Sequence, residues 1–483
     1  MGPSHRSASA ASSVARNSLY GLLALGIDKA AFMGVALALA RILGPADFGR
    51  YTFVLTYVAI FQIVADLGVE MILVRHIAQQ PADRDRLFGS GLGLRLASGA
   101  ACWLIAILLV PLLSDSTYVP LTAVAGAALV GTASQVFRVL YRVSLRIDYL
   151  LVQMSFNAVG TALLVAASLM SGHAVLGALT ATSVASLVTL VLAVWLGRRL
   201  SSFEPRWEPE RWRALVRESL PLGVNAILVN LTFRIGPLVL IRLSGATDVA
   251  YFGAASKLVE ALCLLPEVPM LTIFPLMSVR HREGEQRFRS VSRAALIWIV
   301  LITMPAIITV GGVAGPLLRL MYGSQFGEAV PILELLAWAT IFAASGAVWT
   351  GVLTVLQLQR WLLRSYAVAT AVNLFAAIVL TPRYGSFGAG IATVLGAFAS
   401  QLMLAWLPDT AAYTRPAVFA VLPAVAFGLA GACLTRFYVA SPFLGTALAL
   451  AIYAGAVIAT GALGPEERAF AVRLLRTAGG GEA

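Results

Sequence analysis

The sequence predicts an all-α polytopic membrane protein with about fourteen transmembrane helices. Two observations predict this fold class: 59% of the 483 residues are hydrophobic and only 12% are charged, and the hydrophobic residues gather in long runs. A soluble domain carries about a quarter charged residues, so a soluble globular protein is excluded. Because backbone N–H and C=O groups must be paired inside the chain in lipid, an apolar run of about 20 residues indicates a spanning helix.

Fourteen apolar runs fit a spanning helix, with ends placed to within several residues. They are 17–42, 52–74, 88–113, 119–140, 149–170, 175–196, 217–242, 249–276, 291–314, 330–357, 365–381, 387–407, 416–436 and 443–463. Whether twelve or all fourteen of them span the membrane stays open at this point.

The basic residues predict how these helices are oriented. With the N-terminus placed in the cytoplasm, the cytoplasmic tails and connections hold 25 Lys and Arg residues and the opposite connections hold six. This asymmetry follows the positive-inside rule and predicts a multi-pass protein of the bacterial cytoplasmic (inner) membrane with both termini in the cytoplasm. The net charge of +12 therefore reflects topology, and we expect no nucleic-acid partner.

A polar segment and an internal repeat predict two lobes. We expect an N-terminal lobe over 1–200 (helices 1–6), a cytoplasmic linker over 201–216, a C-terminal lobe over 217–408 (helices 7–12), and two extra helices, 13 and 14, with a cytoplasmic tail over 409–483. A shift of 201 positions lays 16–48 on 217–249 with nine of 33 residues identical, including the pairs Arg41/Arg242, Gly44/Gly245 and Asp47/Asp248. Six helices separate the copies, so the repeat would be parallel, with a site between the lobes. The alternative is chance similarity between two hydrophobic helices.

Several segments resemble the oligosaccharide (polysaccharide biosynthesis, Wzx-type) flippases of the multidrug/oligosaccharidyl-lipid/polysaccharide exporter superfamily. The resemblance rests on the order of motifs along the chain. These are Leu43-Gly44-Pro45-Ala46-Asp47-Phe48-Gly49-Arg50-Tyr51, Ala65-Asp66-Leu67-Gly68, Leu73-Val74-Arg75, Pro316-Leu317-Leu318-Arg319-Leu320-Met321-Tyr322-Gly323 and Tyr384-Gly385-Ser386-Phe387-Gly388-Ala389-Gly390-Ile391-Ala392-Thr393.

The resemblance implies a transporter without covalent chemistry that works by alternating access. Two lobes would surround a central cavity, and the cargo would be a polyprenyl-diphosphate-linked oligosaccharide moved from the cytoplasmic to the outer leaflet for surface polysaccharide assembly. Membrane lipids and polysaccharide polymerase or export proteins would be its partners. A lipid II flippase, a cation-coupled multidrug exporter and, less in keeping with the short outer connections, a membrane glycosyltransferase or polymerase are the alternatives.

Nine ionisable side chains inside the predicted helices are candidates for a role in transport. Each costs about 2.5 to 3.5 kcal/mol at the bilayer centre unless it faces protein or water. The cations that we expect to bind the diphosphate are Arg234 and Lys257 first, then Lys29 and Arg95. Candidate carriers of a coupling ion are Asp28, Asp66, Glu70, Glu260 and Glu267. The competing interpretation is that these cations and acids pair to fix helix packing.

Sequence spacing makes two of these pairings specific. Asp66 and Glu70 are spaced i, i+4 and Lys257 and Glu260 i, i+3, so each pair would share a helix face. Arg95, near the cytoplasmic end of its helix, could instead extend to the inner surface. No catalytic residue, cofactor or metal site is expected, because the three cysteines and four histidines lack ligand spacing, and no phosphate loop for ATP is present.

Overall fold

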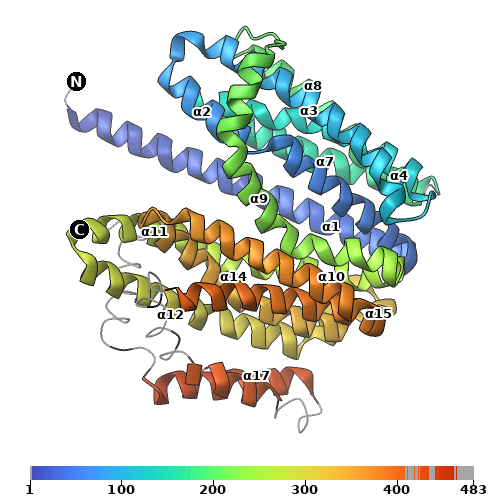
Figure 1. The fold of residues 1–483 in the computed structure, drawn as a ribbon, viewed down its shortest axis with the longest axis vertical. Helices are drawn as coiled ribbons and strands as arrows, with labels where there is room; N and C mark the ends of the chain where they lie inside the picture. Colours follow the sequence, from blue (N-terminus) through green and yellow to red (C-terminus); the bar gives the residue numbers. More distant parts are fainter. Residues whose placement is uncertain are drawn as a thin grey trace. The chain divides into compact units, whose positions relative to one another are not determined.

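A computed structural model of the chain describes residues 3–172, 174–407, 411, 418, 422–423, 425–433, 441–461 and 464. Every regular element of these residues is a helix (Figure 1), which confirms the all-α fold class. The chain divides into two compact units, Met1–Ala250 and Tyr251–Ala483.

The N-terminal unit is a bundle of long and short helices. They are α1 (Pro3–Asp66), α2 (Val69–Gln79), η1 (Pro81–Asp83), α3 (Arg84–Leu113), α4 (Tyr118–Gly126), α5 (Ala128–Gly131), η2 (Thr132–Val136), α6 (Phe137–Val143), α7 (Ile147–Met170), α8 (Val175–Arg198) and α9 (Pro209–Leu243), followed by the start of α10 (Ala246–Leu262). Helix α1 packs against α7, α3 and α9, while α8 packs against α7 and α4 (Figure 1).

The segment between α8 and α9 packs closely on α3, and we call residues 199–208 the strap. The backbone N–H of Arg206 donates to the carbonyl of Gly89 at 3.0 Å. A Cβ atom at Gly89 would overlap the carbonyl oxygen of Glu204, and one at Gly93 would overlap that of Arg206. These glycines therefore let an extended backbone lie directly on the helix, where the sequence predicts a linker between lobes.

Side chains hold the strap near its middle and at its C-terminal end. Phe203 contacts Phe88 and Phe137 edge to face, with ring centroids 4.9 Å and 5.3 Å away. The carboxylate of Glu208 accepts from Arg86 at 3.0 Å. Burial alone would raise the pKa of Glu208, but this hydrogen bond and the nearby guanidinium groups hold it below the ordinary value. The carboxylate thus stays charged at neutral pH.

The C-terminal unit contains the remaining helices. They are most of α10, then α11 (Leu264–Glu283), α12 (Glu285–Gly312), α13 (Ala314–Tyr322), η3 (Ser324–Phe326), α14 (Ala329–Val355), α15 (Gln359–Trp406) and α17 (Pro442–Ala459). The core forms where α12, α14 and α11 meet, around the buried Trp349. Helix α17 is joined to α12, because the hydroxyl of Tyr453 donates to the carbonyl of Leu301 at 3.1 Å.

Eleven helical stretches of the described residues are long and apolar enough to cross a membrane. Two of them, Leu23–Gln79 and Gln359–Trp406, contain kinks at Gly44 and Gly385, where the sequence predicts connections between spans. Parts of the thirteenth predicted helix, 416–436, and the whole tail after 464 lie outside the described residues. The total of fourteen therefore stays a prediction.

The predicted repeat has one structural correlate. Its paired glycines, Gly44 and Gly245, have φ angles of 74° and 97°, a region that L side chains disfavour. Each glycine ends a helical segment of the N-terminal unit. The repeat itself stays a prediction, since two glycines do not establish it.

Candidate functional site

The second predicted span, 52–74, is interrupted in the middle of its apolar run. Helix α1 ends at Asp66 and α2 begins at Val69, and between them Leu67 and Gly68 have φ angles of 45° and 76°. Two successive residues with positive φ cannot continue a right-handed helix. We call residues 66–70 the helix break, and its position corrects the expectation of one continuous helix.

Helix α9 packs tightly against the helix break. A Cβ atom at Gly223 would lie 2.7 Å from the carbonyl oxygen of Leu67, and one at Gly68 would lie 3.2 Å from the Cβ of Leu222. The neighbouring Pro221 lies inside α9. Gly223 is therefore required by the closeness of two backbones, a contact that fixes α9 on the N-terminal unit.

Asp66 and Arg95 meet at the helix break. Nη2 of Arg95 lies 3.8 Å from Oδ1 of Asp66, and the side chain of Arg95 is 2% exposed where that of Asp66 is 33% exposed. Nη2 also donates a long hydrogen bond to the hydroxyl oxygen of Thr132, at 3.5 Å. The hydroxyl of Ser98 donates to the carbonyl of Ala65 at 2.9 Å, which ties α3 to the last turn of α1. Arg95 is thus buried, and the expectation that it could extend to the inner surface is wrong.

Glu70 belongs to the same charged cluster from the other side of the break. Its carboxylate pairs with Arg142 of α6 at 3.0 Å, and Arg138, Asp66 and Arg95 lie close enough to act on it electrostatically. The i, i+4 argument for Asp66 and Glu70 is wrong, because the break separates them. Tertiary packing, not a shared helix face, brings both acids toward Arg95.

Arg138 and Arg142 are not among the residues that the sequence predicts for the site. The charge pattern along the chain places both on the cytoplasmic side, and their i, i+4 spacing is the one sequence signal that they share a helix face. Glu218 of α9 is likewise not predicted from the sequence; it pairs with Arg75 and, at 2.9 Å, with His76 of α2. These contacts join α2 to α6 and α9.

The two cations expected to bind the diphosphate first lie in different units. Arg234 is partly buried on α9 in the N-terminal unit. Lys257, on α10 in the C-terminal unit, pairs with Glu260 at 3.0 Å, with side chains 24% and 44% exposed. The i, i+3 prediction for Lys257 and Glu260 is confirmed.

The other candidates are solvent- or lipid-accessible in the structure. Lys29 is exposed and Asp28 is half-buried on α1, and Glu267 is exposed in the first turn of α11. None of the three forms an ion pair within 4.0 Å among the described residues, so their roles stay predictions. No group of three or more His, Cys, Asp and Glu side chains in the described part of the chain is arranged to hold a metal ion.

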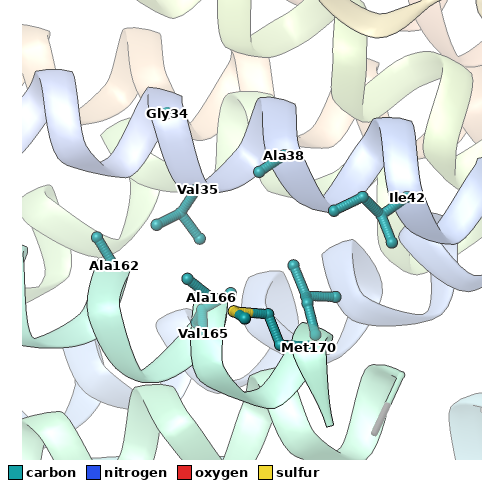
Figure 2. Close-up of a pocket in the computed structure, with 9 residues that line it drawn as sticks. Gly34, Val35, Ala38, Ile42, Ala162, Val165, Ala166 and Met170 are labelled. Carbon is teal, nitrogen blue, oxygen red and sulfur yellow. The ribbon is translucent and has the colours of Figure 1, made fainter. Parts of the chain in front are cut away.

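A cavity of about 380 Å³ lies between α1 and α7 (Figure 2). Val35, Ala38 and Ile42 line it from α1, and Val165 and Met170 line it from α7. All of these side chains are apolar. The cavity therefore offers no donor for a diphosphate, and the charged cluster at the helix break is the stronger candidate for an ionic ligand.

Comparisons with known proteins identify relatives of the chain. A family model described as "Polysaccharide biosynthesis protein" matches residues 14–281. The succinoglycan biosynthesis transport protein ExoT of Rhizobium meliloti (strain 1021) is 25% identical over 315 residues, which cover 62% of this chain. The chain spans 60% of the length of that curated relative.

Solved structures show the same fold at low identity. The lipid II flippase MurJ, in an inward closed conformation, has a TM-score of 0.74 at 10% identity and matches over 95% of this chain and 99% of its own. An inward-facing multidrug resistance MATE family transporter of the MOP superfamily has a TM-score of 0.63 at 17% identity, over 80% of this chain and 96% of its own. The chain thus shares its fold with these two transporters. With more than half of its residues matched by the family model, this chain belongs to the polysaccharide biosynthesis protein family.

Proposed function

We propose that this protein is a flippase that moves a polyprenyl-diphosphate-linked oligosaccharide from the cytoplasmic to the outer leaflet of the bacterial inner membrane. It would do so by alternating access, with both termini in the cytoplasm and without covalent chemistry. The family match, the relative named as a succinoglycan transport protein, and the transporter fold support this proposal.

The observation that carries the proposal is the retention of charged side chains within apolar helices. All nine candidates, from Asp28 to Glu267, fall inside the matched residues 14–281. A glycan with a diphosphate cannot cross hydrocarbon unaided, and cations held out of bulk water bind phosphate oxygens strongly. Arg234 and Lys257, one in each unit, are the side chains that we assign to the cargo first.

The energy for transport would come from an ion gradient or from the cargo's own gradient. The chain contains two lysines, Lys29 and Lys257, and neither belongs to a Gly-rich phosphate loop. The acids Asp28, Asp66, Glu70, Glu260 and Glu267 are the candidate carriers of the coupling ion, because a carboxylate within a membrane-spanning helix can bind a proton or a metal cation.

The test is translocation by the full-length protein in liposomes. A fluorescent polyprenyl-diphosphate oligosaccharide is placed in both leaflets, and its access to an impermeant quencher is followed over time. We expect the wild-type protein to exchange label between leaflets, and the double variant Arg234→Gln/Lys257→Gln to lose at least about tenfold of this rate, since each lost charged hydrogen bond is worth about 1.5 to 3 kcal/mol.

A matched control removes two charges outside the helix interiors. Arg213→Gln/Arg282→Gln changes two exposed arginines and should translocate at the wild-type rate. A normal rate in the Arg234→Gln/Lys257→Gln protein would refute the site assignment. If the protein translocates lipid II but not the glycan carrier, it is a lipid II flippase. If it translocates only a cationic drug, it is a multidrug exporter.

A further inference from the structure

Arg95 is a buried cation with unused hydrogen-bonding capacity. Its guanidinium carries five N–H donors, yet Nε and Nη1 are buried and have no hydrogen-bond partner among the described residues. The 3.8 Å separation from Asp66 exceeds the roughly 2.8 Å of a direct charge-assisted hydrogen bond. A buried charge that lacks partners costs free energy, so this guanidinium has room for a further acceptor.

Asp66 is the member of the pair that reaches the surface. A third of its side chain is exposed, whereas Arg95 behind it is almost fully buried. The hydroxyl of Ser98 accompanies this arrangement, since it bonds the carbonyls of both Ala65 and Arg95. An anion that approaches Arg95 from the surface therefore competes with the carboxylate of Asp66.

The other charged groups around the pair differ in how far they are paired, and Nε of Arg138 is buried without a hydrogen-bond partner among the described residues. Glu70 of α2 pairs with Arg142 of α6, and Arg138 of α6 lies near both Glu70 and Arg95. Cys102 of α3 is the remaining titratable neighbour of Arg95. Helix α9 meets the break through Leu222 and Gly223, and its nearest acid in the sequence, Glu218, is taken by Arg75 and His76.

These arginines exclude a metal cation as the natural ligand of Asp66. The cluster contains two carboxylates, Asp66 and Glu70, and three guanidinium groups, those of Arg95, Arg138 and Arg142. A sodium ion at Asp66 would meet Arg95 at close range, and like charges repel strongly where water is scarce. A proton, by contrast, neutralises the carboxylate of Asp66 without placing a separate positive ion beside Arg95.

We propose that Asp66 and Arg95 form an exchange site that couples one proton to a diphosphate-type anion. When Asp66 is ionised, it holds Arg95. When Asp66 takes a proton from water onto its carboxylate, Arg95 is released, and Nε, Nη1 and Nη2 together bind phosphate oxygens. This inference rests on the proposed function and deepens it, because it makes the cargo and the proton bind together.

Thermodynamic linkage gives the proposal a sign. If the anion binds with uptake of a proton, then lowering the pH strengthens binding, and by reciprocity the anion favours protonation. Full coupling of one proton changes the apparent dissociation constant by about tenfold per pH unit. Replacing Asp66 by Asn removes both the competitor and the proton, so this variant should bind the anion more tightly.

The experiment is calorimetry on the full-length protein in lipid nanodiscs. Farnesyl diphosphate is titrated in buffers of different ionisation enthalpy, and the slope of heat against that enthalpy gives the protons taken up. The wild type should take up as many as about one proton more per bound anion than the Asp66→Asn variant. Because the ionisation of farnesyl diphosphate itself contributes equally to both titrations, it drops out of this difference. A parallel titration with inorganic pyrophosphate shows whether the lipid chain is needed for binding. If pyrophosphate binds as tightly as farnesyl diphosphate, the site binds free phosphates and does not recognise a lipid.

Three further variants separate the site from general folding effects. Arg95→Gln should weaken binding at least about tenfold, while Glu210→Gln, which changes an exposed acid in the first turn of α9, should leave the proton uptake at the wild-type value. Asp66→Glu keeps an ionisable group and should retain proton uptake if Asp66→Asn does not fold. Equal proton uptake in wild type and Asp66→Asn, or unchanged binding in Arg95→Gln, overturns the exchange site alone. Failure of the wild type to bind farnesyl diphosphate or to translocate the glycan carrier overturns the proposed function as well.

Discussion

Leu67 and Gly68 determine where the carboxylate of Asp66 lies within the apolar run. Their positive φ angles end α1 at Asp66, so the carboxylate sits at a helix terminus rather than on a helix face. Transporters commonly place their sites at such interrupted helices. The interruption is held by Gly223 of α9, whose missing side chain lets Leu67 approach.

Replacing Gly223 by Ala tests this contact. The added methyl would lie within 2.9 Å of three backbone atoms of Leu67, so α9 or the helix break must move. We expect a loss of roughly 1 to 3 kcal/mol of stability, typical of overpacking, seen as a lower midpoint of thermal unfolding in nanodiscs. Gly34→Ala, where a Cβ meets nothing within 4 Å, should not lower it, and equal midpoints for the two variants would refute the argument.

The strap shows the same principle at the scale of an element. Residues 199–208 read as a polar linker with prolines, yet they lie in contact with α3 through backbone, aromatic and ionic interactions. Since α9 follows the strap directly and also packs on α1, α2 and α3, the seventh predicted helix belongs physically to the N-terminal unit.

Replacing Gly89 by Ala should detach the strap. Its Cβ would overlap the carbonyl of Glu204, a backbone atom that cannot rotate away, and the hydrogen bond from Arg206 to Gly89 would break. Losing about 1 kcal/mol or more of local stability should speed amide hydrogen exchange in residues 202–207 by roughly fivefold to tenfold, as measured by mass spectrometry. The reference variant is Gly26→Ala, which meets open space; an unchanged exchange rate in Gly89→Ala would contradict the packing.

The sequence predicts where the helices lie better than it predicts the contacts between them. Hydropathy located the spans, Gly44 and Gly385 lie at predicted connections, and local spacing found the pair of Lys257 and Glu260. The pair of Asp66 and Arg95 could not be found in this way, because it depends on how α3 packs on α1. The helix break was hidden for a related reason: Leu67 and Gly68 lie inside an apolar run, and hydropathy does not register backbone angles.

At the scale of the whole molecule, the basic residues predict which side of the membrane each connection faces. Gln286, in the first turn of α12, and Ser324, after α13, are both exposed and are predicted on opposite sides. In a protein with Cys102, Cys263 and Cys433 replaced by Ala, Ser324→Cys should react with an impermeant maleimide added to intact spheroplasts, and Gln286→Cys only after lysis. The reverse pattern would invert the orientation, and equal labelling of both positions would refute the span assignment between them.

The membership of α9 in the N-terminal unit also has a consequence for biosynthesis. The first compact unit extends to Ala250, so a ribosome must deliver seven predicted spans before that unit can close. A nascent chain that stops after α8 lacks Leu222 and Gly223, and the carbonyl groups near Leu67 face lipid without their covering helix. Insertion of the seventh predicted span is therefore the step that covers the backbone carbonyl groups where the second predicted span is interrupted.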